Sequence, residues 1–390
     1  MTNIALETYM KEQLMHVSLK YKRYKYTQMQ WDLRLLSLSG PKGVGKTTMV
    51  LQHILENPEE KSLYVSADHS YFTTHTLIEL ADEFVKDGGE HLYIDEVHKY
   101  DHWSREIKQI YDTHPGLKLL ITSSSVLDLL HGEVDLSRRA VMTHMYGLSL
   151  REYMLFEHDI HVDTYTFDEI LQGKAHLGDI EHPLPYFREF LHHGYYPFYK
   201  EGAFQTRLEQ IAYQTVEVDI AHYAHISLST ARKLRKMLSI ISANVPYKPE
   251  ATALATELGV SRNDIPDLLL YLEKAGMICQ LRDDTGGMRG LGKVEKVFLE
   301  NTNLLYALAG QNAEIGNIRE TAFYQMTRVT HDVIASRKSD FVVEGCTFEV
   351  GGKKKGKKQI KDISDGFVVR DEIEFTTSNI IPLWMFGLMY

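Results

Sequence analysis

One short stretch constrains this chain more than any other: Gly40-Pro41-Lys42-Gly43-Val44-Gly45-Lys46-Thr47. The apolar run from Leu33 to Leu38 predicts a buried strand before it, and residues 48–55 predict a helix after it that ends before Pro58. A strand, a glycine loop, Lys-Thr and a helix in this order are typical of a phosphate-binding loop. Glycines let backbone N–H groups approach an anion, and the helix N-terminus adds partial positive charge. We therefore expect a nucleotide to bind the residues from Gly40 to Thr48. Within them, Lys46 would reach the β- and γ-phosphates, and the Thr47 hydroxyl would bind Mg²⁺.

Two adjacent acids, Asp95 and Glu96, follow the apolar run Leu92-Tyr93-Ile94. Such a pair is common on ordinary loops, but a nucleotide hydrolase needs it opposite a phosphate loop. Asp95 would hold Mg²⁺ through water, and Glu96 would act as general base on the attacking water. The guanine-reading sequence Asn-Lys-x-Asp does not follow, so ATP is favoured over GTP.

Two further groups are candidates for contacts with the γ-phosphate. A hydroxyl among Thr122, Ser123 and Ser124 ends another buried strand and would sense the nucleotide, with Ser124 as our candidate; the alternative is a serine-rich turn. Arg139 would stabilise the transition-state charge, from its own or a neighbouring subunit. The alternative is that Arg138 and Arg139 are ordinary surface residues.

Composition limits the other classes of protein. A chain of 390 residues predicts about two to four domains, and two cysteines suit a reducing cytoplasm. The N-terminal sequence is not typical of a signal peptide, and no apolar run approaches the ~18 residues that span a bilayer. We therefore expect a cytoplasmic protein without a membrane segment. The formal charge of −10 gives no support to bulk nucleic-acid binding, so any such contact must be local.

The pattern of helices and strands predicts an α/β chain of five segments. Residues 1–30 form an N-terminal helical segment, and 31–150 a parallel-sheet ATPase domain whose strands are centred in Leu33–Leu38, Leu63–Ser66, His91–Ile94, Leu117–Thr122 and Val141–Tyr146. Capping boxes at Ser149–Glu152 and Thr166–Glu169 open a helical lid at 151–229. Residues 230–309 predict a winged helix, and 310–390 an α+β tail that closes with a buried strand in Ile380–Tyr390.

Several motifs together resemble a known group of proteins: GPKGVGKTT, LYIDE, ITSSS, LSRR with LSLREY, and SDF, FEVGGKKKG and IPLWMFG in the tail. They are similar to prokaryotic AAA+-like ATPases that carry a C-terminal domain of unknown function with a nuclease-like fold. The resemblance runs from about Leu33 to Tyr390 and implies that Lys46, Thr47, Asp95 and Glu96 take the roles given above. It places the family's arginine at Arg139, with Arg138 where glycine is usual.

The tail contains a partial nuclease pattern. Glu320, Asp340 and Glu349 resemble the acids of a PD-(D/E)xK nuclease, but residue 351 is glycine and the nearest following lysine is Lys353. A lysine strip at Lys353–Lys358 could contact phosphates or could be solvated surface. The basic run Arg232–Lys236 is a second candidate for phosphate contacts.

The sequence thus leads to a main hypothesis and two alternatives. The main one is an ATP-hydrolysing, Mg²⁺-dependent AAA+-like switch that acts on a macromolecular partner, which could be nucleic acid or protein, and that could form a homo-oligomer. The alternatives are an ATP-gated nuclease or defence effector and a non-enzymatic scaffold stabilised by nucleotide.

Overall fold

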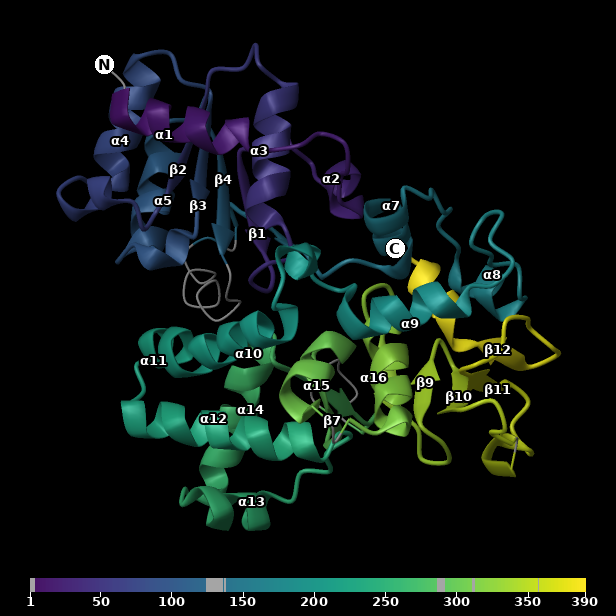
Figure 1. The fold of residues 1–390 in the computed structure, drawn as a ribbon. Coiled ribbons are helices and arrows are strands. Elements are labelled where there is room, and N and C mark those ends of the chain that lie inside the picture. The colour runs from purple at the N-terminus through teal and green to yellow at the C-terminus, as the bar shows by residue number, and fades with distance from the viewer. Residues whose placement is uncertain (1–3, 124–135, 137, 286–291, 311–312, 357) are drawn as a thin grey trace. The chain divides into compact units, whose positions relative to one another are not determined.

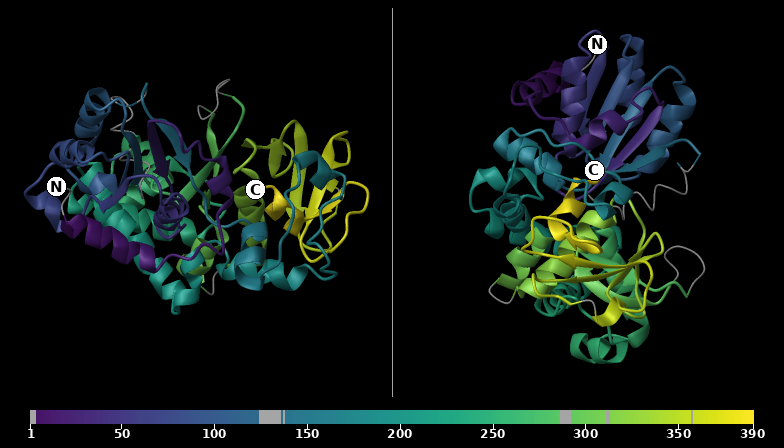
Figure 2. Two further views of the ribbon diagram at one scale, coloured as in Figure 1. Left: turned by 90° about the horizontal axis from the view of Figure 1, so that it is seen from above. Right: turned by 90° about the vertical axis from the view of Figure 1, so that its right-hand side faces the viewer.

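The computed structural model describes residues 4–123, 136, 138–285, 292–310, 313–356 and 358–390 (Figures 1 and 2). The chain divides into two compact units, at residues 1–146 and 147–390. Within the described residues, no helix combines the length and apolarity needed to cross a bilayer.

Unit 1 is built on a parallel sheet. Its described strands have the order β2-β3-β4-β1-β5, and all neighbours run parallel. Their bounds are β1 (Leu35–Ser39), β2 (Ser62–Ser66), β3 (His91–Asp95), β4 (Lys118–Ser123) and β5 (Val141–His144). Each strand lies within two residues of its predicted run. Buried Leu, Ile, Val and Tyr residues fill the inner strands, as both faces of a parallel sheet require.

Helices cover both faces of this sheet (Figure 1). α4 (Leu77–Lys86) and α5 (Trp103–Thr113) pack against each other and share one buried core with alternate residues of the strands. α3 (Lys46–Glu56) lies on the other face, where its His53 ring contacts Tyr93 of β3. α1 (Ile4–Met15) contacts β2 and α3. The short α2 (Tyr24–Gln28) follows an irregular segment, so the first 30 residues are not one continuous helix.

Unit 2 begins with helices. Both predicted capping boxes are present, at the starts of α7 and α8. The described helices of this region are α7 (Leu150–His158), α8 (Phe167–Leu171), α9 (Leu184–His193), η3 (Pro197–Glu201), α10 (Phe204–Gln214), η4 (Thr215–Asp219) and α11 (Ile220–Tyr223).

Three helices and a strand pair follow in the chain. They are α12 (Leu228–Ala243), α13 (Ala251–Leu258), α14 (Ile265–Lys274) with the short η5 (Arg262–Asp264) before it, and the antiparallel strands β6 (Ile278–Arg282) and β7 (Val294–Leu299). Gly259 ends α13 in the left-handed region, at φ 61°. α15 (Thr302–Ala309) packs against α9, α10 and α12, so this segment and the preceding helices share contacts.

The tail contains a mixed sheet beside α16 (Ile315–Thr327). Its described strands have the order β12-β11-β10-β9-β8, with bounds β8 (Val333–Ala335), β9 (Phe341–Val343), β10 (Cys346–Gly351), β11 (Gly366–Arg370) and β12 (Ile380–Pro382). Phe323, Phe341, Phe348 and Phe386 meet in the core between sheet and helix. The prediction of one closing strand was wrong beyond Pro382, because residues Leu383–Leu388 turn into the 3₁₀-helix η8.

Candidate functional site

The glycine loop connects β1 with α3, and its backbone depends on glycine. Gly43 and Gly45 have φ angles of 82° and 97°, which side chains disfavour. A Cβ on Gly40 would lie 2.2 Å from the carbonyl oxygen of Met145, so the loop begins in contact with the segment after β5. Gly45 caps α3 without a side chain, which leaves the first N–H groups of the helix facing the loop as an anion site requires.

Lys46 is held inside this loop. Its side chain is buried, and its ammonium donates to the carbonyl oxygens of Gly40, at 2.7 Å, and Pro41, at 3.0 Å. Burial lowers the pKa of Lys46 to about 8, although the nearby Glu96 and Asp95 carboxylates favour its charged form. The ammonium thus lies where it can reach phosphates bound by the loop, and two carbonyl oxygens accept its hydrogen bonds there.

Asp95 lies at the carboxyl edge of the sheet and accepts hydrogen bonds from three hydroxyls. Thr47 and Tyr64 each donate to Oδ2 at 2.7 Å, and Thr122 donates to Oδ1. The register of the strands causes this gathering, because β2 and β4 flank β3 and all three end at the same edge. Thr47 and Asp95 were predicted to share a site. The sequence analysis missed Tyr64, whose signal was a tyrosine in a buried strand that needs a partner for its hydroxyl.

Glu96 follows in the left-handed region, with φ 50° and ψ 40°. Its backbone N–H donates to the Thr122 hydroxyl at 3.1 Å, and its Oε2 lies 3.2 Å from Nε2 of His98. Burial alone would raise the pKa of the Glu96 carboxyl, but the hydrogen bond and charge of His98, with Lys46 and Lys42, lower it to about 2. The structure therefore brings together Lys46, Thr47, Asp95 and Glu96, as the sequence predicted.

The candidate hydroxyls that the structure describes have different contacts. Thr122 contacts both acids, and the buried Ser123 Oγ lies 3.1 Å from Nδ1 of His98. Ser124, our candidate, lies outside the described residues. His98 itself was missed, although Asp-Glu-Val-His places a polar ring two residues after the second acid.

Arg139 is not at the site of its own chain. Its guanidinium forms two hydrogen bonds of 2.9 Å with the Asp112 carboxylate, in the last turn of α5. It precedes β5, whose Val141 pairs with Leu36 near the start of β1, whereas the glycine loop follows the end of β1. One strand length, roughly 13 Å at 3.3 Å per residue, separates those edges. The contacts of Arg139 described here are those of an ion pair with Asp112, and its catalytic role stays a prediction.

An N-terminal segment supports the loop from outside. Arg23 is buried and donates to the carbonyl oxygens of Val44, in the loop, and Tyr146, at 2.9 Å. The Gln52 amide of α3 donates to the carbonyl oxygens of Ser18 and Tyr21. The sequence predicted a helical segment here, and its pattern did not indicate these contacts with the loop and α3.

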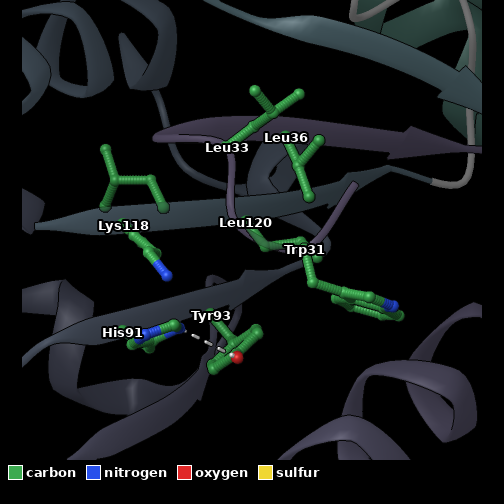
Figure 3. Close-up of a pocket in the computed structure, with 8 residues that line it drawn as sticks. Trp31, Leu33, Leu36, His91, Tyr93, Lys118 and Leu120 are labelled. Carbon is green, nitrogen blue, oxygen red and sulfur yellow. Dashed lines mark hydrogen bonds between the residues drawn. The ribbon is translucent and has the colours of Figure 1, made fainter. Parts of the chain in front are cut away.

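A small pocket lies at the opposite edge of the sheet (Figure 3). Trp31 stacks on His53 of α3 beside it, and the Tyr93 hydroxyl lies 3.5 Å from Nδ1 of His91. The residues that line the pocket are Trp31, Leu33, Leu36, His91, Tyr93, Lys118, Leu119 and Leu120. Because His91 and Lys118 begin their strands, this pocket is separate from the glycine loop.

The acids of the tail are paired with lysines. Lys296 of β7 bridges Glu320, at 2.8 Å, and Asp340, at 3.3 Å. Glu349 is buried and pairs with Lys355 at 2.5 Å. Among the described residues, no group of three or more His, Cys, Asp and Glu side chains is arranged to hold a metal ion. Lys296 was not singled out in the sequence, because its partners lie in other elements.

The basic run on α12 is largely used inside the fold. The ammonium groups of Lys233 and Lys236 donate at 2.7 Å to the carbonyl oxygens of Gly259 and Glu257, at the end of α13. Arg235 pairs with Glu217 at 3.0 Å. Three of its basic groups thus already have partners. In the lysine strip, Lys353 and Lys354 are exposed, and Lys357 lies outside the described residues.

Comparison with known proteins agrees with the geometry of unit 1. Residues 32–154 match the model of a AAA domain. Unit 1 has an AAA-type, P-loop ATPase-like fold. Residues 184–315 match a domain of unknown function, DUF8612, so the nuclease-like part of the resemblance stays a prediction.

One curated relative and several solved structures are similar to the chain. The uncharacterized protein MJ1637 of Methanocaldococcus jannaschii is 25% identical over 292 residues, which are 67% of this chain and 59% of that protein. The chain thus matches less than two thirds of the length of this relative. A Walker-type ATPase of Pyrococcus abyssi has a TM-score of 0.43 and 11% identity, over 74% of this chain and 95% of that one. AMPPCP-bound DnaA from Aquifex aeolicus has a TM-score of 0.25 and 14% identity, over 70% and 88%.

Proposed function

We propose that this protein binds and hydrolyses ATP at the carboxyl edge of the unit 1 sheet. The observation that carries the proposal is a hydrogen-bonded cluster in which the Thr47 and Thr122 hydroxyls donate to the Asp95 carboxylate. Lys46 adjoins Thr47 in the chain, Glu96 adjoins Asp95, and the charge of Glu96 acts on Lys46. The AAA-domain match over residues 32–154 supports it. Nucleotide and Mg²⁺ are the expected ligands of such a site.

The residues present fit Mg²⁺ and phosphate. A hydroxyl and a carboxylate are hard oxygen ligands, and the Thr47 Oγ1 and Asp95 Oδ2 atoms are already 2.7 Å apart. When bound, Mg²⁺ would neutralise charge on the phosphate oxygens. Residues 40–48 would bind the phosphates through their backbone, and Lys46 would move its ammonium from the carbonyl oxygens of Gly40 and Pro41 to the phosphates.

Glu96 is suited to accept a proton from water. It is ionised at neutral pH, since its pKa is lowered to about 2, and its backbone is fixed by the hydrogen bond to Thr122. Thr122 and Ser123 remain candidates for sensing the γ-phosphate, as does Ser124.

Phosphate release by purified protein with ATP and Mg²⁺ tests the proposal. Lys46→Ala should abolish tight ATP binding because it removes a charge-assisted contact. Glu96→Gln should bind ATP but hydrolyse it about 10²–10⁴-fold more slowly. Glu90→Gln is the matched control, because Glu90 precedes the same strand at its other end and should keep wild-type turnover. Equal turnover in wild type and Glu96→Gln would refute the general-base role.

Arg139 remains a candidate only across a subunit interface. If it acts there, ATPase rate per chain should rise with protein concentration, and Arg139→Ala should remove that rise. A monomeric mass with a concentration-independent rate would reduce Arg139 to the structural ion pair with Asp112.

We also propose that unit 2 carries the contact with a macromolecular partner. The order α12, α13, α14, β6, β7 supports a winged helix, and the mixed sheet beside α16 supports a restriction-endonuclease-like fold. A cleaving nuclease is disfavoured because Lys296 already forms ion pairs with Glu320 and Asp340. Cleavage of labelled DNA or RNA with Mg²⁺ or Mn²⁺, lost in Asp340→Ala, would restore the nuclease alternative.

Nucleic acid and protein are both open as partners. If Lys353–Lys358 contacts phosphates, DNA affinity should fall steeply with salt, by roughly 0.9 in log–log slope per contact. Replacing Lys353, Lys354, Lys355, Lys357 and Lys358 with Ser should flatten that slope. An unchanged slope and affinity would direct the search to proteins, with Glu96→Gln as the trapped form for capture.

A further inference from the structure

His98 connects the ends of two neighbouring strands. It lies in η2 (Val97–Lys99), directly after β3, and its side chain is fully buried. Nε2 lies 3.2 Å from Oε2 of Glu96, and Nδ1 lies 3.1 Å from Oγ of Ser123, the last residue of β4. Both ring nitrogens therefore contact groups at the edge where the phosphates are proposed to bind.

The chemistry of these partners determines the proton positions on the ring. An ionised carboxylate only accepts hydrogen bonds, so Nε2 must carry the proton and donate to Glu96. Nδ1 then accepts from the Ser123 hydroxyl when the ring is neutral, and donates to the hydroxyl oxygen when the ring is protonated. In both states the His98–Glu96 hydrogen bond is retained, and Ser123 determines what happens at the other nitrogen.

We propose that His98 is a positioning residue for hydrolysis: it holds the Glu96 carboxylate in place for water activation and links it to Ser123. This inference rests on the proposed ATPase function and adds a residue to it. A histidine buried for packing alone needs no pair of directed contacts, whereas this ring spans the general-base candidate and a candidate hydroxyl sensor. If Ser123 shifted toward the γ-phosphate, the His98 ring that contacts it would shift as well and would change the position of the Glu96 carboxylate.

Other charges also face Glu96 and limit what His98 contributes. Lys42 and Lys46 approach from the loop and α3 and favour the ionised carboxylate. Asp95 lies beside it on β3 and takes its hydrogen bonds from Thr47, Tyr64 and Thr122. Without His98, the carboxylate would keep these two lysines near it but would lose the contact with Nε2 that holds Oε2 in place.

The first test compares His98→Ala, His98→Gln and wild type in steady-state ATPase assays that give kcat and KM for ATP. A general base displaced by about 1 Å can lose on the order of 100-fold in rate, so His98→Ala should lower kcat by about 10–100-fold with KM for ATP little changed. His98→Gln retains an N–H donor and should recover part of kcat.

His91→Gln is the matched control. His91 is also buried and near an acid, Glu60, but it begins β3 at the other edge of the sheet. It should keep the wild-type kcat. A folded His98→Ala with wild-type kcat would overturn the proposal.

A second measurement does not depend on hydrolysis. Long-range ¹H–¹⁵N spectra of the nucleotide-free protein, with His98 assigned from His98→Gln, should show a protonated Nε2. A ring protonated only at Nδ1 would leave Glu96 without its donor and would overturn the proposal even if His98→Ala fails to fold. Inactive wild-type protein would instead refute the ATPase function, while an active wild type with an unaffected His98→Ala would refute only the role of His98.

Discussion

Tyr64→Phe isolates one of the three hydroxyl donors on Asp95. Tyr64 and Asp95 are 2% and 5% exposed, so water cannot replace the lost donor without rearrangement. Hydrogen bonds to charged groups contribute about 1.5–3 kcal/mol, and Thr47 still donates to the same oxygen. We expect the free energy of unfolding of unit 1 to fall by about 1.5–3 kcal/mol. For a unit of this size, that corresponds to a lower thermal midpoint by about 3–12 °C.

Tryptophan fluorescence can follow unit 1 alone. Trp31 and Trp103 lie in this unit and Trp384 lies in unit 2, so a Trp384→Phe background removes the signal of the second unit. Tyr93→Phe is the control, because Tyr93 is similarly buried and its hydroxyl lies 3.5 Å from Nδ1 of His91 and not on the Asp95 carboxylate. The control should lose less than about 1 kcal/mol. Equal midpoints for Tyr64→Phe and Tyr93→Phe would refute the claim that the Asp95 hydrogen bond stabilises this edge.

Two further predictions concern the loop and the tail. Gly40→Ala should lower the free energy of unfolding of unit 1 by more than about 2 kcal/mol and weaken ATP binding, because a Cβ would clash with Met145. Gly116→Ala, where a Cβ would meet open space, should change that free energy by less than about 0.5 kcal/mol, and equal effects of the two changes would contradict the close approach at Gly40. In the tail, burial and the nearby Asp340 raise the pKa of Glu320 above its ordinary value of 4.5. Between the unfolded and the folded pKa, the folded state therefore holds a proton that the unfolded state has lost. The free energy of unfolding of unit 2 should decrease as pH rises through this range. Glu320→Gln should remove this part of the slope in urea unfolding at several pH values, and an unchanged slope would refute it.

The sequence predicted the parts of the site that depend on local pattern. Parallel strands must end at one edge, so a glycine loop after one strand and two acids after another could be expected to meet. The strand runs of unit 1 were recognisable because buried parallel strands are continuously apolar. The two capping boxes were predicted because each is complete within four residues.

The rest depended on contacts between distant residues. Arg139 pairs with Asp112, 27 positions earlier, and no periodicity indicates that contact. Lys296 reaches Glu320 and Asp340 from a different element, and no pattern in the sequence indicates those two ion pairs. The closing segment was apolar enough for a strand, but its backbone changed to a 3₁₀-helix after Pro382.

The contacts around Gly40 and Arg23 have a thermodynamic consequence. Met145 and Tyr146 are the last two residues of unit 1, and the loop touches one through Gly40 while Arg23 joins the other to Val44. A ligand that alters the loop therefore acts on the residues from which unit 2 departs. Coupling free energies are reciprocal. If a partner shifts Met145 and Tyr146 on binding and so weakens nucleotide affinity tenfold, it must itself bind tenfold more weakly when nucleotide is present. At about 1.4 kcal/mol, that exchange is comparable to one charge-assisted hydrogen bond.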